Sequence, residues 1–94
     1  MILGKIIGTV WATRKDESLT GAKLLIVRQL DLQYQEKDNF VVAVDSVGAG
    51  HGEVVLVATG SSARQTNNTK NKPVDAVVMA IVDRLDVKKA ASGE

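Results

Sequence analysis

Short apolar runs separated by polar segments recur along the whole chain. The first, residues 2–13, is rich in β-branched side chains and contains Gly4 and Gly8, where a strand either bends sharply or admits a second backbone. We therefore expect a long, curved first strand there. Three further runs have the length and the bounding turn residues of strands, namely residues 22–30, 40–44 and 53–59.

The last apolar run spans residues 75–87. Its β-branched content favours a strand, although its length also permits a helix. Residues 14–21 and 31–39 are polar, and we expect a loop and a turn there, each joining two strands. The pattern as a whole predicts five strands.

One short helix is expected directly after Gly60. Either Ser61 or Ser62 caps it in this prediction, because a serine hydroxyl accepts a backbone N–H group left free in the first turn. The helix then runs through Gln65. Residues 66–73 are polar, and we expect a mobile loop.

Five strands and one short helix predict an all-β fold. The sheet closes, or nearly closes, into a small barrel, because closure removes the edges that an open sheet exposes. The 94 residues suffice for one compact core, so we expect a single domain over residues 1–87 and a flexible C-terminal tail over residues 88–94. That core must be aliphatic, since 45% of the residues are apolar while Phe, Trp and Tyr occur once each.

Charge and composition exclude several classes of function. Twelve basic and eleven acidic residues give a formal charge of +1, without the basic excess that is typical of nucleic-acid binding. Trp11, Tyr34 and Phe40 are too few to stack successive bases. The chain has no cysteine, no apolar run approaching the roughly 20 residues that span a bilayer, and no signal-peptide pattern at its start. We expect a cytoplasmic protein that binds neither nucleic acid nor a membrane.

Three alternate glycines, Gly48, Gly50 and Gly52, lie between the third and fourth predicted strands. A phosphate-binding loop needs a glycine pattern that opens a helix or ends in Gly-Lys-Ser/Thr, and this segment has neither. The glycines instead predict a tight, left-handed loop in which backbones pack closely. On this interpretation Gly50→Val disrupts folding or assembly, because a β-branched residue does not readily take up a positive φ.

His51 is the only histidine, which excludes a multi-histidine metal site within one chain. As a catalytic group it would need Asp45, Ser46 or Glu53 as its partner. A solvated loop histidine is the favoured interpretation.

Residues 61–64 leave two interpretations open. They form either an anion-binding nest that includes the charge of Arg64, or a serine-capped helix start whose arginine makes an ion pair. Three carboxylates that lie near the ends of apolar runs, Asp45, Asp75 and Asp83, are expected to accept turn N–H groups or to pair with Arg28, Arg64 or Arg84. No nucleophile–base set, metal set or cofactor loop emerges, so we expect no enzymatic activity, no metal and no cofactor.

Five segments match one family in order and spacing: residues 8–13, 19–25, 42–53, 60–65 and 73–83. Together they closely resemble the pentameric vertex proteins of bacterial microcompartment shells, the ethanolamine-utilisation and carboxysome vertex family. The likeness runs from Met1 to about residue 86.

This resemblance implies a small barrel related to the oligonucleotide-binding fold, five copies of which close around an axis. It implies a structural protein of the bacterial cytoplasm, whose homopentamers fill the corners of a polyhedral shell tiled by hexameric and pseudohexameric proteins. The alternative is a pentameric pore or gate for small metabolites or anions. Candidates for the pore or the subunit interface come from two loops: Gly48, Ala49, Gly50, His51, Gly52, Glu53, Ser61, Ser62, Ala63 and Arg64.

Overall fold

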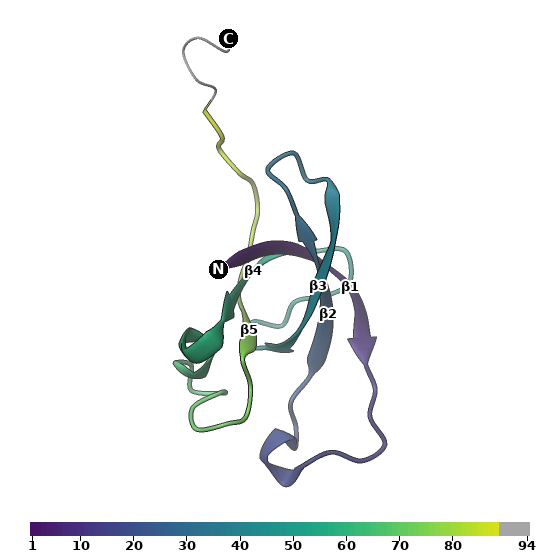
Figure 1. Cartoon of the computed structure of the whole chain (residues 1–94), viewed down its shortest axis with the longest axis vertical. Helices are drawn as coiled ribbons and strands as arrows, with labels where there is room; N and C mark the ends of the chain where they lie inside the picture. Colours follow the sequence, from purple (N-terminus) through teal and green to yellow (C-terminus); the bar gives the residue numbers. More distant parts are fainter. Residues whose placement is uncertain (89–94) are drawn as a thin grey trace.

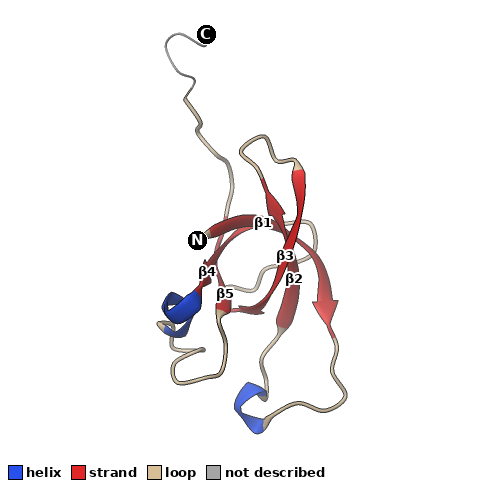
Figure 2. Cartoon of the chain, in the orientation of Figure 1, coloured by secondary structure: helices blue, strands red, loops and turns tan. Residues whose placement is uncertain are grey.

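The structure, a computed structural model that describes residues 1–88, is a closed barrel of five strands (Figure 1 and Figure 2). The predicted small, closed, all-β barrel is therefore confirmed. Around the barrel the strands follow the order β1-β2-β3-β5-β4. The elements in chain order, with η marking a 3-10 helix, are β1 (Ile2–Val10), η1 (Glu17–Leu19), β2 (Leu24–Leu30), β3 (Glu36–Asp45), β4 (Val54–Thr59), η2 (Gly60–Arg64) and β5 (Ala76–Ile81).

One junction of the barrel differs from the other four. β3 and β5 run parallel and pair through Val44↔Val77 and Asp45↔Val78, whereas the remaining neighbours are antiparallel. The hydroxyl of Ser46 donates to the carbonyl oxygen of Val78 at 2.5 Å, just beyond this short ladder. The junction of β3 with β5 closes the barrel.

The interior of the barrel is aliphatic, as predicted. Alternate strand residues point inward and, together with Ala49 from the loop between β3 and β4, form one cluster of Ile6, Leu25, Val27, Ala43, Ala49, Val55, Val57, Ala76 and Val78. Fully burying one Val, Leu or Ile side chain stabilises a fold by about 1.5–3 kcal/mol. The three aromatic residues, Trp11, Tyr34 and Phe40, are all exposed.

A second buried cluster lies outside the barrel wall. Val44, Ala58, Ala63 and Val77 form it, with Ala22, Leu24 and Val74 packed at its margin. These residues come from β2, β3, β4 and β5, from η2 and from the segments that precede β2 and β5. Packing of Ala63 in this cluster fixes η2 against the outer face of the barrel.

β1 is bent, and its two glycines have the two roles that the sequence suggested. The register between β1 and β2 shifts between Ile6 and Gly8, which places a bulge in the strand. At Gly4 the neighbouring strand comes close, because a Cβ added there would meet Val27 Cγ1 and would lie 2.8 Å from the carbonyl oxygen of Arg28. The strand is shorter than predicted, since it ends at Val10 and residues 11–13 are not strand.

β3 is longer than predicted. Residues 36–39 were assigned to a polar turn, but they continue the hairpin of β2 and β3 beyond the barrel, with Leu30 opposite Glu36. Only residues 31–35 turn, and Asp31 Oδ1 accepts the backbone N–H groups of Gln33 at 2.8 Å and Gln35 at 3.0 Å. Residues 36–39 are exposed, so they carry none of the apolar alternation that marks a buried strand.

β5 is a strand, which excludes the helical alternative, but it is shorter than residues 75–87. Val82 N–H still donates to the carbonyl oxygen of Val54 at 2.8 Å, and residues 82–88 then lead away from the barrel without regular structure (Figure 1). Of the predicted tail at residues 88–94, residues 89–94 lie outside the described part of the chain.

η1 was not predicted, because residues 14–21 were assigned to a loop. The carboxylate of Asp16 begins this turn and accepts the hydroxyl of Ser18 at 2.6 Å and its backbone N–H at 2.9 Å. The hydrogen bond from the Ser18 hydroxyl, followed by the one from its backbone, lowers the pKa of the Asp16 carboxyl. The turn is short and fully polar at its start, so it shows no helical periodicity.

Gly4→Ala is expected to lower the free energy of unfolding by about 1–3 kcal/mol, because the new methyl group overpacks the junction of β1 with β2. Gly8→Ala is the matched control on the same strand, since its Cβ would touch only the Ile26 side chain, whose movable end is the nearest atom at 3.4 Å. Urea denaturation at one fixed subunit concentration measures both. Equal midpoints for the two variants would contradict the close approach at Gly4.

Candidate functional site

The glycine loop between β3 and β4 is left-handed at two positions. Gly48 has φ 74° and Gly52 has φ 86°, which confirms the expected left-handed turn at these two residues. Gly50 has no positive φ, so the reason given for a damaging Gly50→Val substitution is wrong. The expected close packing of backbones is wrong as well, because a Cβ would meet nothing within 4 Å at Gly48 or Gly52, and only Glu53 Oε1 at 3.5 Å at Gly50.

Two carboxylates hold this loop in shape. Asp45 Oδ1 accepts the backbone N–H groups of Val47, Gly48 and Ala49 at 3.1, 3.1 and 3.2 Å. Glu53 Oε1 accepts the N–H of Gly50 at 2.6 Å. Asp45 therefore binds turn N–H groups, which is one of the two roles expected for it.

The loop also closes one part of the barrel interior. Ala49 is buried in the inner cluster. The N–H of Gly52 donates to the carbonyl oxygen of Ile6 at 2.8 Å. The N–H of Ile6 donates in turn to the carbonyl oxygen of Glu53 at 3.0 Å. The glycine loop is therefore tied to β1, beside the bulge, and it carries part of the core.

His51 projects from this loop into solvent, as expected for a solvated loop histidine. Each residue that was considered as its catalytic partner has another hydrogen bond: Asp45 and Glu53 within the loop, and Ser46 to the carbonyl oxygen of Val78. The arrangement contains no nucleophile held against a base.

The turn after β4 begins differently from the prediction. Thr59 occupies the N-cap of η2 with φ −126° and makes no side-chain capping hydrogen bond, so neither Ser61 nor Ser62 caps the helix. Both serines are exposed. Gly60, with φ 68°, reverses the chain instead, and its N–H donates to the carbonyl oxygen of Asp75 at 2.8 Å.

Arg64 is half-buried and hydrogen-bonds to the segment that leads into β5. Its NH1 group donates to the carbonyl oxygen of Val74 at 2.9 Å. Within residues 1–88 the ion pairs are Lys5 with Glu36 at 3.1 Å and Arg84 with Asp86 at 3.4 Å. Among the described residues neither Asp75 nor Asp83 makes the arginine pair that was one of the two alternatives expected for it.

Thr69 is the residue of this region that the sequence analysis missed. It is 0% exposed, and its hydroxyl donates to the carbonyl oxygen of Ala63 at 2.6 Å. Thr66 Oγ1 accepts the N–H of Thr69 at 3.1 Å and lies 2.6 Å from its hydroxyl. Two threonines three residues apart are typical of a side-chain-stabilised turn, and that spacing was the available signal. The predicted mobility of residues 66–73 stays a prediction.

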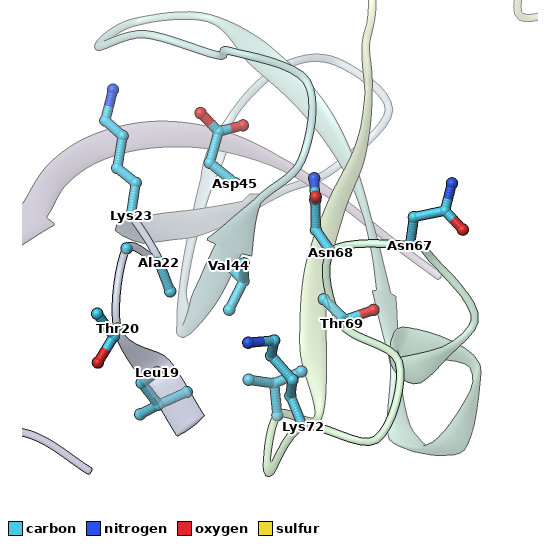
Figure 3. A pocket seen from close by; sticks show the side chains of 12 residues that line it. Leu19, Thr20, Ala22, Lys23, Val44, Asp45, Asn67, Asn68, Thr69 and Lys72 are labelled. Carbon is cyan, nitrogen blue, oxygen red and sulfur yellow. The ribbon is translucent and has the colours of Figure 1, made fainter. Parts of the chain in front are cut away.

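Two clefts border this region. The first, of about 440 Å³, separates Lys23 and Asp45 from Asn67, Asn68 and Thr69 (Figure 3). Lys72 lies between the two walls and its Nζ donates to the carbonyl oxygen of Ser18 at 3.0 Å. The Asp45 carboxylate already accepts hydrogen bonds from the glycine loop, and Lys72 Nζ already donates to Ser18. Among the described residues, this cleft therefore offers no free acid–base pair.

The second cleft, of about 550 Å³, contains two of the candidate residues, Ser61 and Arg64. Lys70 adds a second cation, and the remaining lining residues, Gln65, Thr66, Asn67 and Asn71, are neutral and polar. Among residues 1–88 no carboxylate lines it. A small anion is the ligand that suits such a lining.

The structure places the candidate residues in two separate regions. The glycine loop belongs to the inner cluster through Ala49, whereas η2 belongs to the outer cluster through Ala63. Both alanine side chains are fully buried in their own subunit. Among residues 1–88, no group of His, Asp and Glu is arranged to hold a metal ion, and no helix there is long and apolar enough to cross a membrane.

Asp45→Ala is expected to lower the free energy of unfolding by about 1–3 kcal/mol, because three backbone N–H groups lose their hydrogen-bond acceptor. One of them, the N–H of Ala49, is partly buried, so water replaces the lost acceptor only in part. Asp45→Asn keeps an oxygen at Oδ1 and should lose less. Asp38→Ala, at an exposed strand position, is the control for charge alone. Thermal unfolding at fixed subunit concentration compares them, and equal stability of Asp45→Ala and Asp38→Ala would show that the loop does not depend on Asp45.

Comparison with known proteins gives one consistent result. The family model described as ethanolamine utilisation protein EutN/carboxysome matches residues 1–83. The bacterial microcompartment shell vertex protein GrpN of Rhodospirillum rubrum is 49% identical over 86 residues, which cover 92% of this chain and 97% of GrpN. The carboxysome shell vertex protein CcmL of Synechocystis sp. is 47% identical over 87 residues, which cover 93% of this chain and 87% of CcmL.

Solved structures agree with this result. The structure of the GrpN pentameric microcompartment shell protein from Rhodospirillum rubrum superposes with a TM-score of 0.86 at 48% identity, covering 94% of this chain and 100% of that chain. CcmL of Gloeobacter violaceus gives a TM-score of 0.88 at 41% identity, over 93% and 90% of the two chains. The sequence resemblance is confirmed: this chain belongs to the EutN/CcmL family, whose named relatives are shell vertex proteins of bacterial microcompartments.

Proposed function

We propose that this chain is a structural, non-enzymatic shell protein, five copies of which cap a vertex of a polyhedral bacterial microcompartment. The observation that carries the proposal is the match to GrpN, a named shell vertex protein with a pentameric structure, over 97% of its length in sequence and 100% of its chain in structure. The shell lies in the bacterial cytoplasm. Its flat facets consist of hexameric and pseudohexameric shell proteins, which the pentamer contacts along its rim.

The geometry of a closed shell explains why such a protein is needed. A sheet of hexagonal tiles stays flat, and it closes into a polyhedron only where pentagons replace hexagons. Identical subunits that contact one another through two different surfaces form a ring when the rotation closes. Support from the chain itself comes from its unpaired apolar surface, because large side chains such as Trp11 and Phe40 are exposed in the single subunit.

A second candidate function, a pore that passes small anions, is favoured by the second cleft. Arg64 and Lys70 line it together with Ser61, and no carboxylate is among its lining residues. In a ring these residues would occur five times around one axis. The test is permeability: Arg64→Gln with Lys70→Gln should slow the entry of an anionic substrate into assembled shells while a neutral substrate enters as before.

Native mass spectrometry of the purified protein is expected to show a ring of five at micromolar concentration. A monomer alone would contradict the ring. A ring of six would preserve the barrel but remove the vertex geometry, because six-fold tiles do not introduce curvature.

Deleting the gene is expected to leave flat facets that assemble into elongated or open shells, because hexagonal tiles still join edge to edge. Enzymes of the compartment should keep their activity in lysate, while the pathway fails in cells because intermediates leak. His51→Ala should restore closed shells, since the His51 side chain is solvated. Electron microscopy and lysate assays decide: closed shells together with one missing enzymatic step would overturn the structural function.

A further inference from the structure

The outer surface of the barrel carries an apolar strip on β3. Phe40 and Val42 lie two residues apart, on the same face of the strand, and are 60% and 41% exposed. Beside Val42 the strip continues into a shallow hollow of about 130 Å³, whose apolar lining includes Leu19, Leu24, Val44, Pro73 and Val74. None of residues 1–88 fills this hollow or covers Phe40 within one subunit.

Trp11 is the most exposed large hydrophobic side chain of residues 1–88, at 90%. It stands immediately after the last residue of β1, at the start of the loop that leads to η1. A tryptophan side chain buries roughly 150–250 Å² when it packs, and tryptophan is enriched among the residues that dominate interfaces. Leaving it in water in the assembled protein would forgo that stabilisation.

The strip and Trp11 belong to different strands, although the hollow extends as far as Leu24, the strand neighbour of Val10. β2 separates the two strands, because Val10 pairs with Leu24 and Leu24 pairs with Val44. Two strand spacings are roughly 10 Å, and the strands curve round the closed barrel between them. One subunit thus presents an aromatic side chain at the end of β1 and a separate apolar strip on β3. Two unlike, complementary surfaces produce head-to-tail contacts, which is the arrangement that closes a ring.

We propose that Trp11 of one subunit packs on Phe40 and Val42 of the next subunit and reaches into the hollow beside Val42. This inference rests on the proposed function, because it requires a ring, and it assigns the two surfaces through which the ring closes. The strip supplies an aromatic face and a β-branched side chain, which are good packing partners for an indole. The contact repeats at every subunit boundary.

The wild-type protein tests the contact without any substitution, since Trp11 is the only tryptophan. In the ring, Trp11 is expected to emit at shorter wavelength than in the urea-unfolded chain and to be quenched several-fold less by acrylamide. A ring of five, verified by native mass spectrometry, in which acrylamide quenches Trp11 as freely as in the unfolded chain would overturn the inference and leave the vertex function intact. A protein that forms no ring would overturn both.

Phe40→Asp introduces a charge on the strip and should dissociate the ring or shift the Trp11 emission towards that of the unfolded chain. Leu32→Asp is its matched control, because Leu32 is 59% exposed at the hairpin tip, off the strip. A barrel retained by circular dichroism separates dissociation from unfolding. The inference fails if the two variants behave alike, whether both keep the ring or both lose it.

A disulfide tests the pair directly, because the chain has no cysteine of its own. Trp11→Cys combined with Val42→Cys should give, after oxidation, a ladder of covalent species up to the pentamer on a non-reducing gel. A bond within one chain is excluded by the spacing of roughly 10 Å or more, since a disulfide needs Cα atoms within about 7 Å. Each single-cysteine variant is the control and should give at most a dimer. A double variant that also stops at dimer would show that Trp11 and Val42 are not neighbours across the boundary.

Discussion

Closure of the barrel through the short parallel junction of β3 with β5 is the constraint on which the rest of the structure depends. Only Val44↔Val77 and Asp45↔Val78 pair there, so the junction has few backbone hydrogen bonds of its own. Side chains supplement it: Ser46 donates to Val78, and Val44 and Val77 pack together in the outer cluster. Without this junction, β3 and β5 would both be open edges, which an apolar sheet of this size does not tolerate in water.

Asp45 joins the closing junction to the glycine loop. Its backbone pairs with β5, and its carboxylate turns the chain by holding three successive N–H groups. Gly48 and Gly52 supply the positive φ values that bring Ala49 into the core and return the chain to β1. The glycines therefore serve backbone conformation at the end of the barrel. Close backbone approach occurs elsewhere, at Gly4.

The sequence predicted the elements whose side chains are buried and missed the features that depend on polar contacts. The central parts of all five strands follow from aliphatic runs, because burial imposes that pattern. Residues 36–39 carry no such pattern, since that part of the hairpin projects beyond the core and its side chains are exposed, with Glu36 paired to Lys5. Thr69 looked like part of a polar loop, because the sequence does not distinguish an exposed threonine from a buried one. Its burial depends on hydrogen bonds to Ala63 and Thr66, which only the structure reveals.

The candidate site was predictable as two loops but not in its detail. The family resemblance located residues 48–53 and 61–64, while their conformations depend on partners distant in sequence, such as Ile6 for the first loop and Val74 for Arg64. The serine cap failed because Gly60 reverses the chain and η2 begins there, two residues earlier than it would with Ser61 as its N-cap. Local propensity was overridden by the hydrogen bond from Gly60 to Asp75, which the packing of β4 beside β5 imposes.

A closed barrel has a further consequence for assembly. The five strands close on one another within the chain, but β3 pairs with β5 only through Val44 and Asp45, so among the described residues its residues 36–43 have a strand partner on one side alone. The net charge of +1 provides little long-range attraction or repulsion between copies. Exposed apolar side chains are therefore an important source of affinity, and where the barrel places them helps to set the angle between subunits. A rigid barrel that holds exposed apolar side chains in fixed positions suits a protein proposed to form a five-fold corner. In such a protein the shape of each subunit determines the curvature of the shell.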